Sequence, residues 1–244
     1  RPAGVVGDWF FTLDPDGVDP VLKVHSLGEC YRKGNPHYDQ RSTVPAIVDV
    51  TTGAVVNNDY HDLTTELETA WKKYFRPDAP DLYPEALHDD IDALNDIIYA
   101  DVNLAVNLAA LVTSQKDYEF YYNKVFDRLD WLEKRLSSRR YLFGDTITDP
   151  DIRLYVTLAR FDLVFYQKYY VNKKRLVDYP NLLNYAKDLY SHPAFGKNTD
   201  FDSMRKRFYY VDHTPFEDFP RIVPKGPDMS IWEEPNDRAA KFAK

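Results

Sequence analysis

The second half of the chain carries a helical hydrophobic pattern, and this pattern constrains the fold most. Apolar residues return every three or four positions at Leu87, Ile91, Leu94, Ile98, Val102, Ala105, Ala109 and Val112. That spacing places them on one face of an α-helix, so we expect a single helix of about seven turns. The same spacing predicts a second helix over about 116–136.

Two further helices are marked by their starting signals. In TDPDIRLYVTLARFDLVFY, Thr148 and Asp151 form a capping box, and Pro150 occupies the first turn. Pro180 opens the fourth helix, NLLNYAKDLYSH. Together these four segments predict an all-α domain.

The residues before this domain follow a different pattern. VLKVHSLGECYRKG predicts a short helix, and 41–59, RSTVPAIVDVTTGAVVNND, predicts a hairpin in which Gly53 supplies the turn. A helix is expected from Tyr60, and RPDAPDLYP, with its three prolines, ends it. We therefore divide the chain into a β-containing part (1–75), a helical domain (76–211) and an extended tail without regular structure (212–244).

Pro45 is the unusual residue of the hairpin. Proline has no N–H for a sheet ladder, so it belongs at an edge, at a bulge or in a cis turn. It either ends the pairing of the strands or shapes a binding site.

Composition and motifs exclude several classes of function. The net charge of -8 argues against a nucleic-acid partner, and no apolar run reaches the ~18 residues that span a membrane. The six histidines lack the spacing of metal ligands, so no metal site is expected. With nine glycines, the chain has neither a dinucleotide fingerprint nor a P-loop. The single cysteine, Cys30, indicates a reducing, cytoplasmic setting and is interpreted as an inert thiol.

Several blocks together resemble one family. They are NPHYDQRSTVPAIVD, VVNND, TSQKDY, DIRLYVTLARFD, DYPNLLNYAKDLY and RFYYVDHTPFEDFPRIVPKGPD. In this order they are similar to the glutathionyl-hydroquinone reductases, the Xi class of glutathione transferases. The resemblance runs from about Asn35 to Asp228. It implies an α+β thioredoxin-like part, incomplete in this chain, followed by the all-α C-terminal domain of glutathione transferases.

The resemblance also implies a reaction. Members of the family are homodimers that use a thiol to reduce thiol-conjugated hydroquinones. A cysteine attacks the sulfur of the conjugate, hydroquinone leaves, and a second thiol resolves the mixed disulfide. The thiol is glutathione or a similar small thiol such as mycothiol, and the substrate is a conjugate of a quinone or hydroquinone.

Site residues follow from the same resemblance. Val44, before Pro45, corresponds to the residue that pairs with the cysteinyl part of glutathione, and Asp59 and Tyr60 lie where the next helix is expected to begin. Without the resemblance, Asn57–Asp59 would be read as a helix cap. Tyr99 and Tyr209 match positions that line the hydroquinone pocket, although core packing is an alternative for both.

The chain departs from the family pattern in three ways. The Cys-Pro-Trp motif that carries the nucleophile is missing, so we expect the nucleophile upstream of Arg1. The usual Glu-Ser pair is Asp59-Tyr60, which motivates the mycothiol alternative. A Tyr-Lys pair beyond Tyr99 is replaced by Asn107-Leu108. Two other functions therefore stay open: a non-catalytic dimeric scaffold, and a thiol transferase that conjugates electrophiles.

Overall fold

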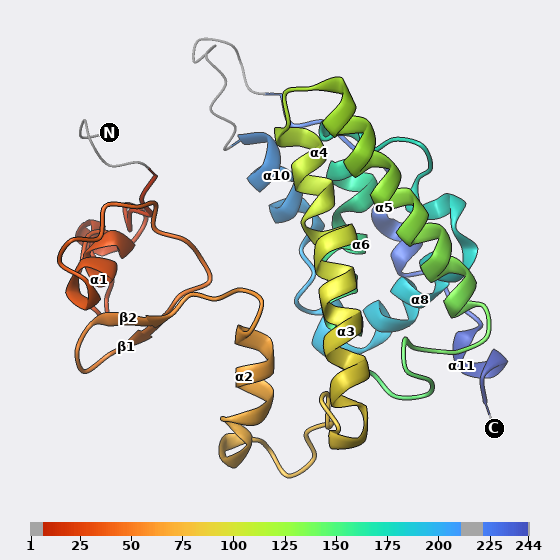
Figure 1. The fold of residues 1–244 in the computed structure, drawn as a ribbon, viewed down its shortest axis with the longest axis horizontal. Coiled ribbons are helices and arrows are strands. Elements are labelled where there is room, and N and C mark those ends of the chain that lie inside the picture. The colour runs from red at the N-terminus through yellow and green to blue at the C-terminus, as the bar shows by residue number, and fades with distance from the viewer. Residues whose placement is uncertain (1–6, 211–221, 244) are drawn as a thin grey trace. The chain divides into compact units, whose positions relative to one another are not determined.

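The computed structural model describes residues 7–210 and 222–243. The chain divides into two compact units, 1–79 and 80–244. Each unit has its own apolar core. Figure 1 shows the helices and strands of both units.

The first unit contains the predicted hairpin between two helices. Its elements are η1 (Pro15–Gly17), α1 (Leu27–Gly34), β1 (Ile47–Asp49), β2 (Ala54–Asn57), α2 (Leu63–Thr69) and η2 (Lys72–Tyr74). The two strands pair antiparallel, with Val48 opposite Val55, and Gly53 takes a φ of 67° in the connecting turn. The hairpin and α1 are confirmed, although β1 begins only after Pro45.

A small apolar cluster holds the first unit together. Val24, Leu27, Cys30 and Tyr31 are buried, and Val48 and Val55 of the hairpin pack against them. The helix α1 begins with a capping box in which Glu29 accepts from the main-chain N–H of Ser26 at 3.1 Å. One face of α1 thus lies against the hairpin.

The second unit is a bundle of helices. Its first half comprises η3 (Glu85–Leu87), α3 (His88–Ile98), η4 (Tyr99–Asn103), α4 (Ala105–Leu111) and α5 (Gln115–Leu136). Its second half comprises α6 (Asp149–Arg160), η5 (Phe161–Phe165), α7 (Tyr166–Lys168), η6 (Leu176–Asp178), α8 (Pro180–Ser191), α9 (Pro193–Gly196), α10 (Phe201–Tyr210), η7 (Met229–Trp232) and α11 (Arg238–Lys241). No helix among the described residues is long and apolar enough to cross a bilayer.

Two of the predicted helices contain a π-helical turn. The first long helix changes at η4, where the N–H of Leu104 donates to the carbonyl of Tyr99, five residues earlier. Before this turn α3 packs against α6, and after it α4 packs against α5. A second π-helical turn, η5, joins α6 to α7. The prediction of one uninterrupted helix over 87–112 was therefore wrong, because one inserted turn lets the helix contact two different neighbours.

The other helical predictions hold. The helices α5 and α8 match the predicted spans, and α6 starts with the capping box, where Asp151 accepts from the N–H of Thr148 at 2.9 Å. The core between these helices is continuous and includes fully buried Ile98, Phe126 and Leu158.

Residues 222–243, which we call the strap, belong to the second unit and pack against its helices. A tail without regular structure was expected here, but the strap contains the short helices η7 and α11. Trp232 is 4% exposed and belongs to the core. Arg238 is 1% exposed, and its guanidinium donates to the carbonyls of Leu136 and Asn181. The expectation failed because the apolar Trp232 and the arginine make long-range contacts that local sequence does not reveal.

Candidate functional site

The predicted thiol-binding residues lie at the open end of the hairpin. The Val44–Pro45 peptide bond is cis, as the binding-site interpretation of Pro45 requires. Val44 is 52% exposed, and no described residue forms a hydrogen bond to its main chain. Its N–H and C=O therefore have no hydrogen-bond partner among the described residues, and a peptide-like ligand can pair with them.

Two hydrogen bonds hold Thr43, the residue before Val44, in position. The hydroxyl of Tyr31, on α1, donates to the carbonyl of Thr43 at 2.9 Å. The side-chain amide of Asn58, beyond β2, donates to the Thr43 hydroxyl at 3.1 Å. Because Tyr31 is buried, α1 anchors the residue directly before Val44. The sequence gives no local signal for this network, since its members are twelve and fifteen residues apart.

Asp59 caps the turn that leads into α2. Its carboxylate accepts from the N–H groups of His61 at 2.8 Å and Asp62 at 3.3 Å. The helix itself begins at Leu63, later than expected. The N-cap residue of α2 is Asp62, so Asp59 caps the turn that precedes the helix and not the helix itself. Tyr60 is 49% exposed.

A cavity of about 340 Å³ lies beside Asp59. It lies between the hairpin and α2 and is lined by Ile47, Val56, Asn57, Asp59, Asp62, Leu63, Glu66, Leu67 and Trp71. Its apolar wall includes Val56, Leu67 and Trp71, three exposed hydrophobic side chains. Its rim carries the carboxylates of Asp59, Asp62 and Glu66. The chemistry suits an ammonium group next to an apolar segment.

Cys30 does not take part in this site. Its side chain is fully buried in the cluster between α1 and the hairpin. Burial raises the pKa of the Cys30 thiol, although Lys33 opposes this increase. A buried thiol with a raised pKa forms little thiolate, which agrees with the inert interpretation.

Tyr99 is the first residue of the π-helical turn η4. Its side chain is half-buried. The turn is tied to α6 by Asn103, whose amide donates to the carbonyl of Arg153 at 3.0 Å and to the hydroxyl of Thr157 at 2.5 Å. Such turns are frequent at functional sites. Asn107, which replaces the tyrosine of the family's Tyr-Lys pair, donates to the carbonyl of Asn103 at 2.7 Å.

Tyr209 lies near the end of α10. Its hydroxyl is buried, and among the residues described it has no hydrogen-bond partner. Burial raises the pKa of the Tyr209 phenol. A buried hydroxyl without a partner loses free energy unless a ligand or water pairs with it. The hydroxyl of Tyr209 is thus able to pair with a ligand, and the pocket role of both tyrosines stays a prediction.

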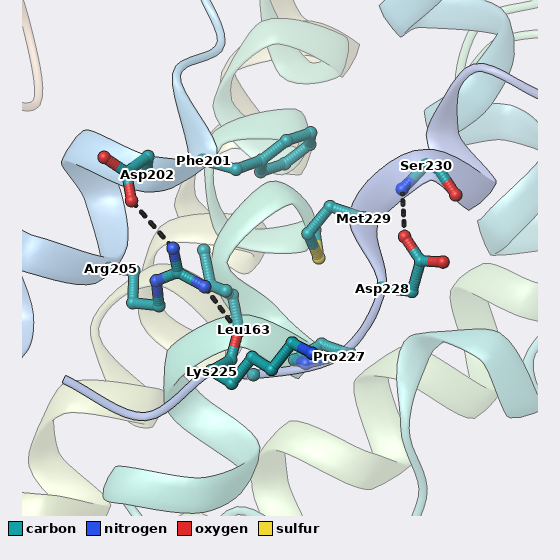
Figure 2. Close-up of a pocket in the computed structure, with 10 residues that line it drawn as sticks. Leu163, Phe201, Asp202, Arg205, Lys225, Pro227, Asp228, Met229 and Ser230 are labelled. Atoms are coloured by element: carbon teal, nitrogen blue, oxygen red, sulfur yellow. Dashed lines mark hydrogen bonds and ion pairs between the residues drawn. The ribbon is translucent and has the colours of Figure 1, made fainter.

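A larger cavity, of about 850 Å³, separates α10 from the strap (Figure 2). Most of its polar groups pair with one another. Arg205 donates to Asp202 at 2.7 Å and to the carbonyl of Lys225, while Asp228 accepts from the N–H of Ser230 at 2.9 Å. None of the predicted site residues lines this cavity. Of these bonds, the one from Arg205 to the carbonyl of Lys225 joins α10 to the strap.

Comparison with known proteins identifies the family. Residues 115–188 match the family described as glutathione S-transferase, C-terminal domain. Glutathionyl-hydroquinone reductase YqjG of Escherichia coli (strain K12) is 35% identical over 244 residues, which cover 99% of this chain and 73% of that protein. The chain belongs to the glutathionyl-hydroquinone reductases.

Solved structures support the same family. A glutathione transferase from Gordonia bronchialis superposes with a TM-score of 0.89 and 43% identity, over 95% of this chain and 72% of that one. The glutathione-bound structure of YqjG from Escherichia coli K-12 gives a TM-score of 0.85 and 34% identity, over 96% and 75%. The predicted fold, a thioredoxin-like part followed by the all-α glutathione-transferase domain, is therefore confirmed.

Proposed function

We propose that this protein reduces thiol-conjugated hydroquinones and that glutathione is its thiol. The observation that carries the proposal is its relationship to the glutathionyl-hydroquinone reductase YqjG over 99% of the chain. The glutathione-bound structure of that relative supports glutathione as the thiol. The exposed position of Val44 before the cis Pro45 supports it as well, because a main chain without a partner among the described residues can pair with a peptide-like ligand.

The reaction proceeds in two exchanges at sulfur. A cysteine thiolate attacks the sulfur of the conjugate, and the carbon–sulfur bond breaks. Its electron pair goes to the ring carbon, which takes up a proton, so hydroquinone leaves and a cysteine–glutathione disulfide remains. A second glutathione attacks this disulfide, which releases oxidised glutathione and restores the thiol. We place the attacking cysteine upstream of Arg1, because Cys30 is buried.

Each predicted residue has a role in this scheme. Val44 pairs with the cysteinyl part of glutathione, and Pro45 holds the turn. Asp59 receives the ammonium group of the γ-glutamyl part, next to the apolar wall of the 340 Å³ cavity. Tyr60, beside Asp59, contributes its exposed phenol to the same end of the ligand.

The two tyrosines act on the quinol part. The buried hydroxyl of Tyr209 has no hydrogen-bond partner among the described residues and donates to a quinol oxygen. Exclusion of water strengthens such a hydrogen bond. Tyr99 contributes a second phenol from η4. We further propose that the protein is a homodimer and that it lies in the cytoplasm. Light scattering tests the first point and cell fractionation the second.

A direct assay decides between this function and its alternatives. Full-length protein is incubated with a glutathionyl-hydroquinone and glutathione, and hydroquinone and oxidised glutathione are quantified by mass spectrometry. Equal amounts of both products are expected. Formation of a new conjugate from an electrophile and glutathione, without hydroquinone release, would favour a conjugating transferase. Absence of both reactions would favour a scaffold.

The thiol is tested in parallel by titration calorimetry. Glutathione is expected to bind more tightly than mycothiol. The reverse order would assign the protein to mycothiol, since Asp59 and Tyr60 replace the usual Glu-Ser pair.

A further inference from the structure

Lys168 contacts the last turn of α10, which carries Tyr209. It is the final residue of α7, directly after the π-helical turn η5. Its ammonium group donates a hydrogen bond to the carbonyl of Phe208. That carbonyl belongs to α10 (Phe201–Tyr210) and directly precedes Tyr209 in the chain.

The same ammonium group lies against the aromatic ring of Tyr209. The distance from Nζ of Lys168 to the centre of that ring is 5.2 Å. A cation at this distance is attracted to the face of the ring. Lys168 therefore holds both the main chain before Tyr209 and the Tyr209 side chain itself.

Two aromatic neighbours of Lys168 complete the attachment of α10. The ring of Phe208 packs edge-on against Phe165, with 5.9 Å between ring centres, and against Tyr169, with 6.0 Å. The end of α10 is thus contacted by three residues that lie within about one and a half helical turns, Phe165, Lys168 and Tyr169. They lie this close together because η5 and α7 continue the helix that α6 begins.

We propose that Lys168 is a positioning residue for Tyr209, one that orients the phenol toward the quinol oxygen and strengthens it as a hydrogen-bond donor. The inference rests on the proposed reductase function. The positive charge favours the partial negative charge that develops on the phenol oxygen when it donates its proton to a substrate. Burial raises the pKa of the Tyr209 phenol, because it disfavours the charged form.

The test compares Lys168→Met, which keeps the length of the side chain and removes the charge, with Lys168→Arg, which keeps the charge. Lys173→Met is the matched control. Lys173 has a similar contact, with its Nζ 5.6 Å from the centre of the ring of Phe126, which belongs to α5. We expect Lys168→Met to lower kcat roughly tenfold with little change in KM. We expect Lys168→Arg to restore most of kcat and Lys173→Met to leave it unchanged.

A spectroscopic readout makes the result independent of turnover. In full-length protein labelled with fluorotyrosine, the fluorine resonance that disappears in Tyr209→Phe belongs to Tyr209. Lys168→Met is expected to move this resonance, and Lys173→Met is expected to leave it in place. A resonance that does not move overturns the proposal, whatever the activity.

The remaining outcomes distinguish failure of the positioning role of Lys168 from failure of the reductase function. If the resonance moves but kcat stays unchanged in Lys168→Met while it falls in Tyr209→Phe, the positioning role is overturned and the reductase function stands. If the wild-type protein releases no hydroquinone, the reductase function fails, and the resonance still decides whether Lys168 orients Tyr209. Circular dichroism of each variant identifies loss of folding. If Lys168→Met does not fold, the activity and the resonance of Lys168→Arg are compared with those of the wild type instead.

Discussion

The hydroxyl of Tyr31 donates a 2.9 Å hydrogen bond to the carbonyl of Thr43, the residue directly before Val44. A buried side chain of α1 therefore sets the position of the turn that is proposed to pair with glutathione. The bond links the small apolar cluster of the first unit to its binding surface.

Replacing Tyr31 by phenylalanine tests this link. Tyr31→Phe keeps the ring and removes the hydrogen bonds of the Tyr31 hydroxyl with the carbonyl and the hydroxyl of Thr43. We therefore expect a loss of about 2 kcal/mol in stability and a ~5-fold weaker affinity for glutathione. Urea unfolding measures the first and titration calorimetry the second.

The control for this variant is Tyr38→Phe. Tyr38 stacks on Tyr31, with 4.6 Å between ring centres, and its hydroxyl donates to the carbonyl of Arg41 at 2.7 Å. It loses an equivalent hydrogen bond that does not reach Thr43. Equal losses of affinity in both variants would contradict a specific role for Tyr31.

Arg238 is predicted to be the most important polar residue of the strap. Its guanidinium donates to the carbonyls of Leu136 at the end of α5, Arg139 and Arg140 directly after α5, and Asn181 in α8. Because a buried carbonyl without a donor costs 1–3 kcal/mol, we expect Arg238→Met to lower the free energy of unfolding by about 3 kcal/mol.

Thermal and urea unfolding measure this loss. Lys241→Met is the control, since Lys241 lies on the same short helix and is exposed. Arg238→Lys is expected to recover little stability, because an ammonium group cannot span acceptors that the planar guanidinium reaches together. Full stability in Arg238→Lys would mean that charge alone, and not this geometry, holds the strap.

Local signals made much of the fold predictable. The capping box of Thr148 and Asp151, the glycine turn at Gly53 and the regular apolar spacing of α5 each depend on residues close in sequence. Such features form through hydrogen bonds and packing within one or two turns, so their residue patterns are diagnostic. Family resemblance supplied what these patterns lack, the order of the domains and the chemistry.

The unpredicted features depend on contacts between distant segments. Ile98 and Val102 are both fully buried and keep a helical spacing across η4, so the sequence does not reveal the inserted turn. Arg238 meets Leu136 across 102 residues. At the candidate site, Pro45 was recognised from its position in a strand, whereas the Tyr31 bond to Thr43 and the contact of Lys168 with Tyr209 required the structure.

Alkaline conditions are expected to destabilise the second unit through Tyr155. Burial raises the pKa of this phenol to about 12, although the hydrogen bond with Thr199 opposes part of the increase. A group with a raised pKa in the folded state contributes stability that is complete below its unfolded pKa of 10.0. That stability is lost as pH rises through the folded value, because the unfolded chain releases the proton first.

Urea unfolding between pH 9 and 12 measures this effect. We expect stability to decline over that range and the decline to be shallower in Tyr155→Phe. Tyr170→Phe is the matched control, since Tyr170 is 64% exposed. Identical slopes for Tyr155→Phe and the wild type would show that other groups cause the alkaline loss.

The hydrogen bonds of Asn103 are predicted to hold the π-helical turn in place. The turn lets α3 contact α6 while α4 contacts α5, and Asn103 ties it to Arg153 and Thr157. We expect Asn103→Ala to lower the free energy of unfolding by about 2 kcal/mol, since it removes two hydrogen bonds. Thr157→Val removes only the shorter one and should cost about 1 kcal/mol.

A double-mutant cycle isolates the pair. The sum of the two single losses in free energy of unfolding should exceed the loss in the double variant by about 1 kcal/mol. The reason is that Asn103→Ala and Thr157→Val each remove the same hydrogen bond. Hydrogen exchange at the amide of Leu104, which donates to Tyr99, should accelerate in Asn103→Ala and change less in Thr157→Val. Strict additivity together with unchanged exchange would mean that the surrounding helices maintain the turn without Asn103.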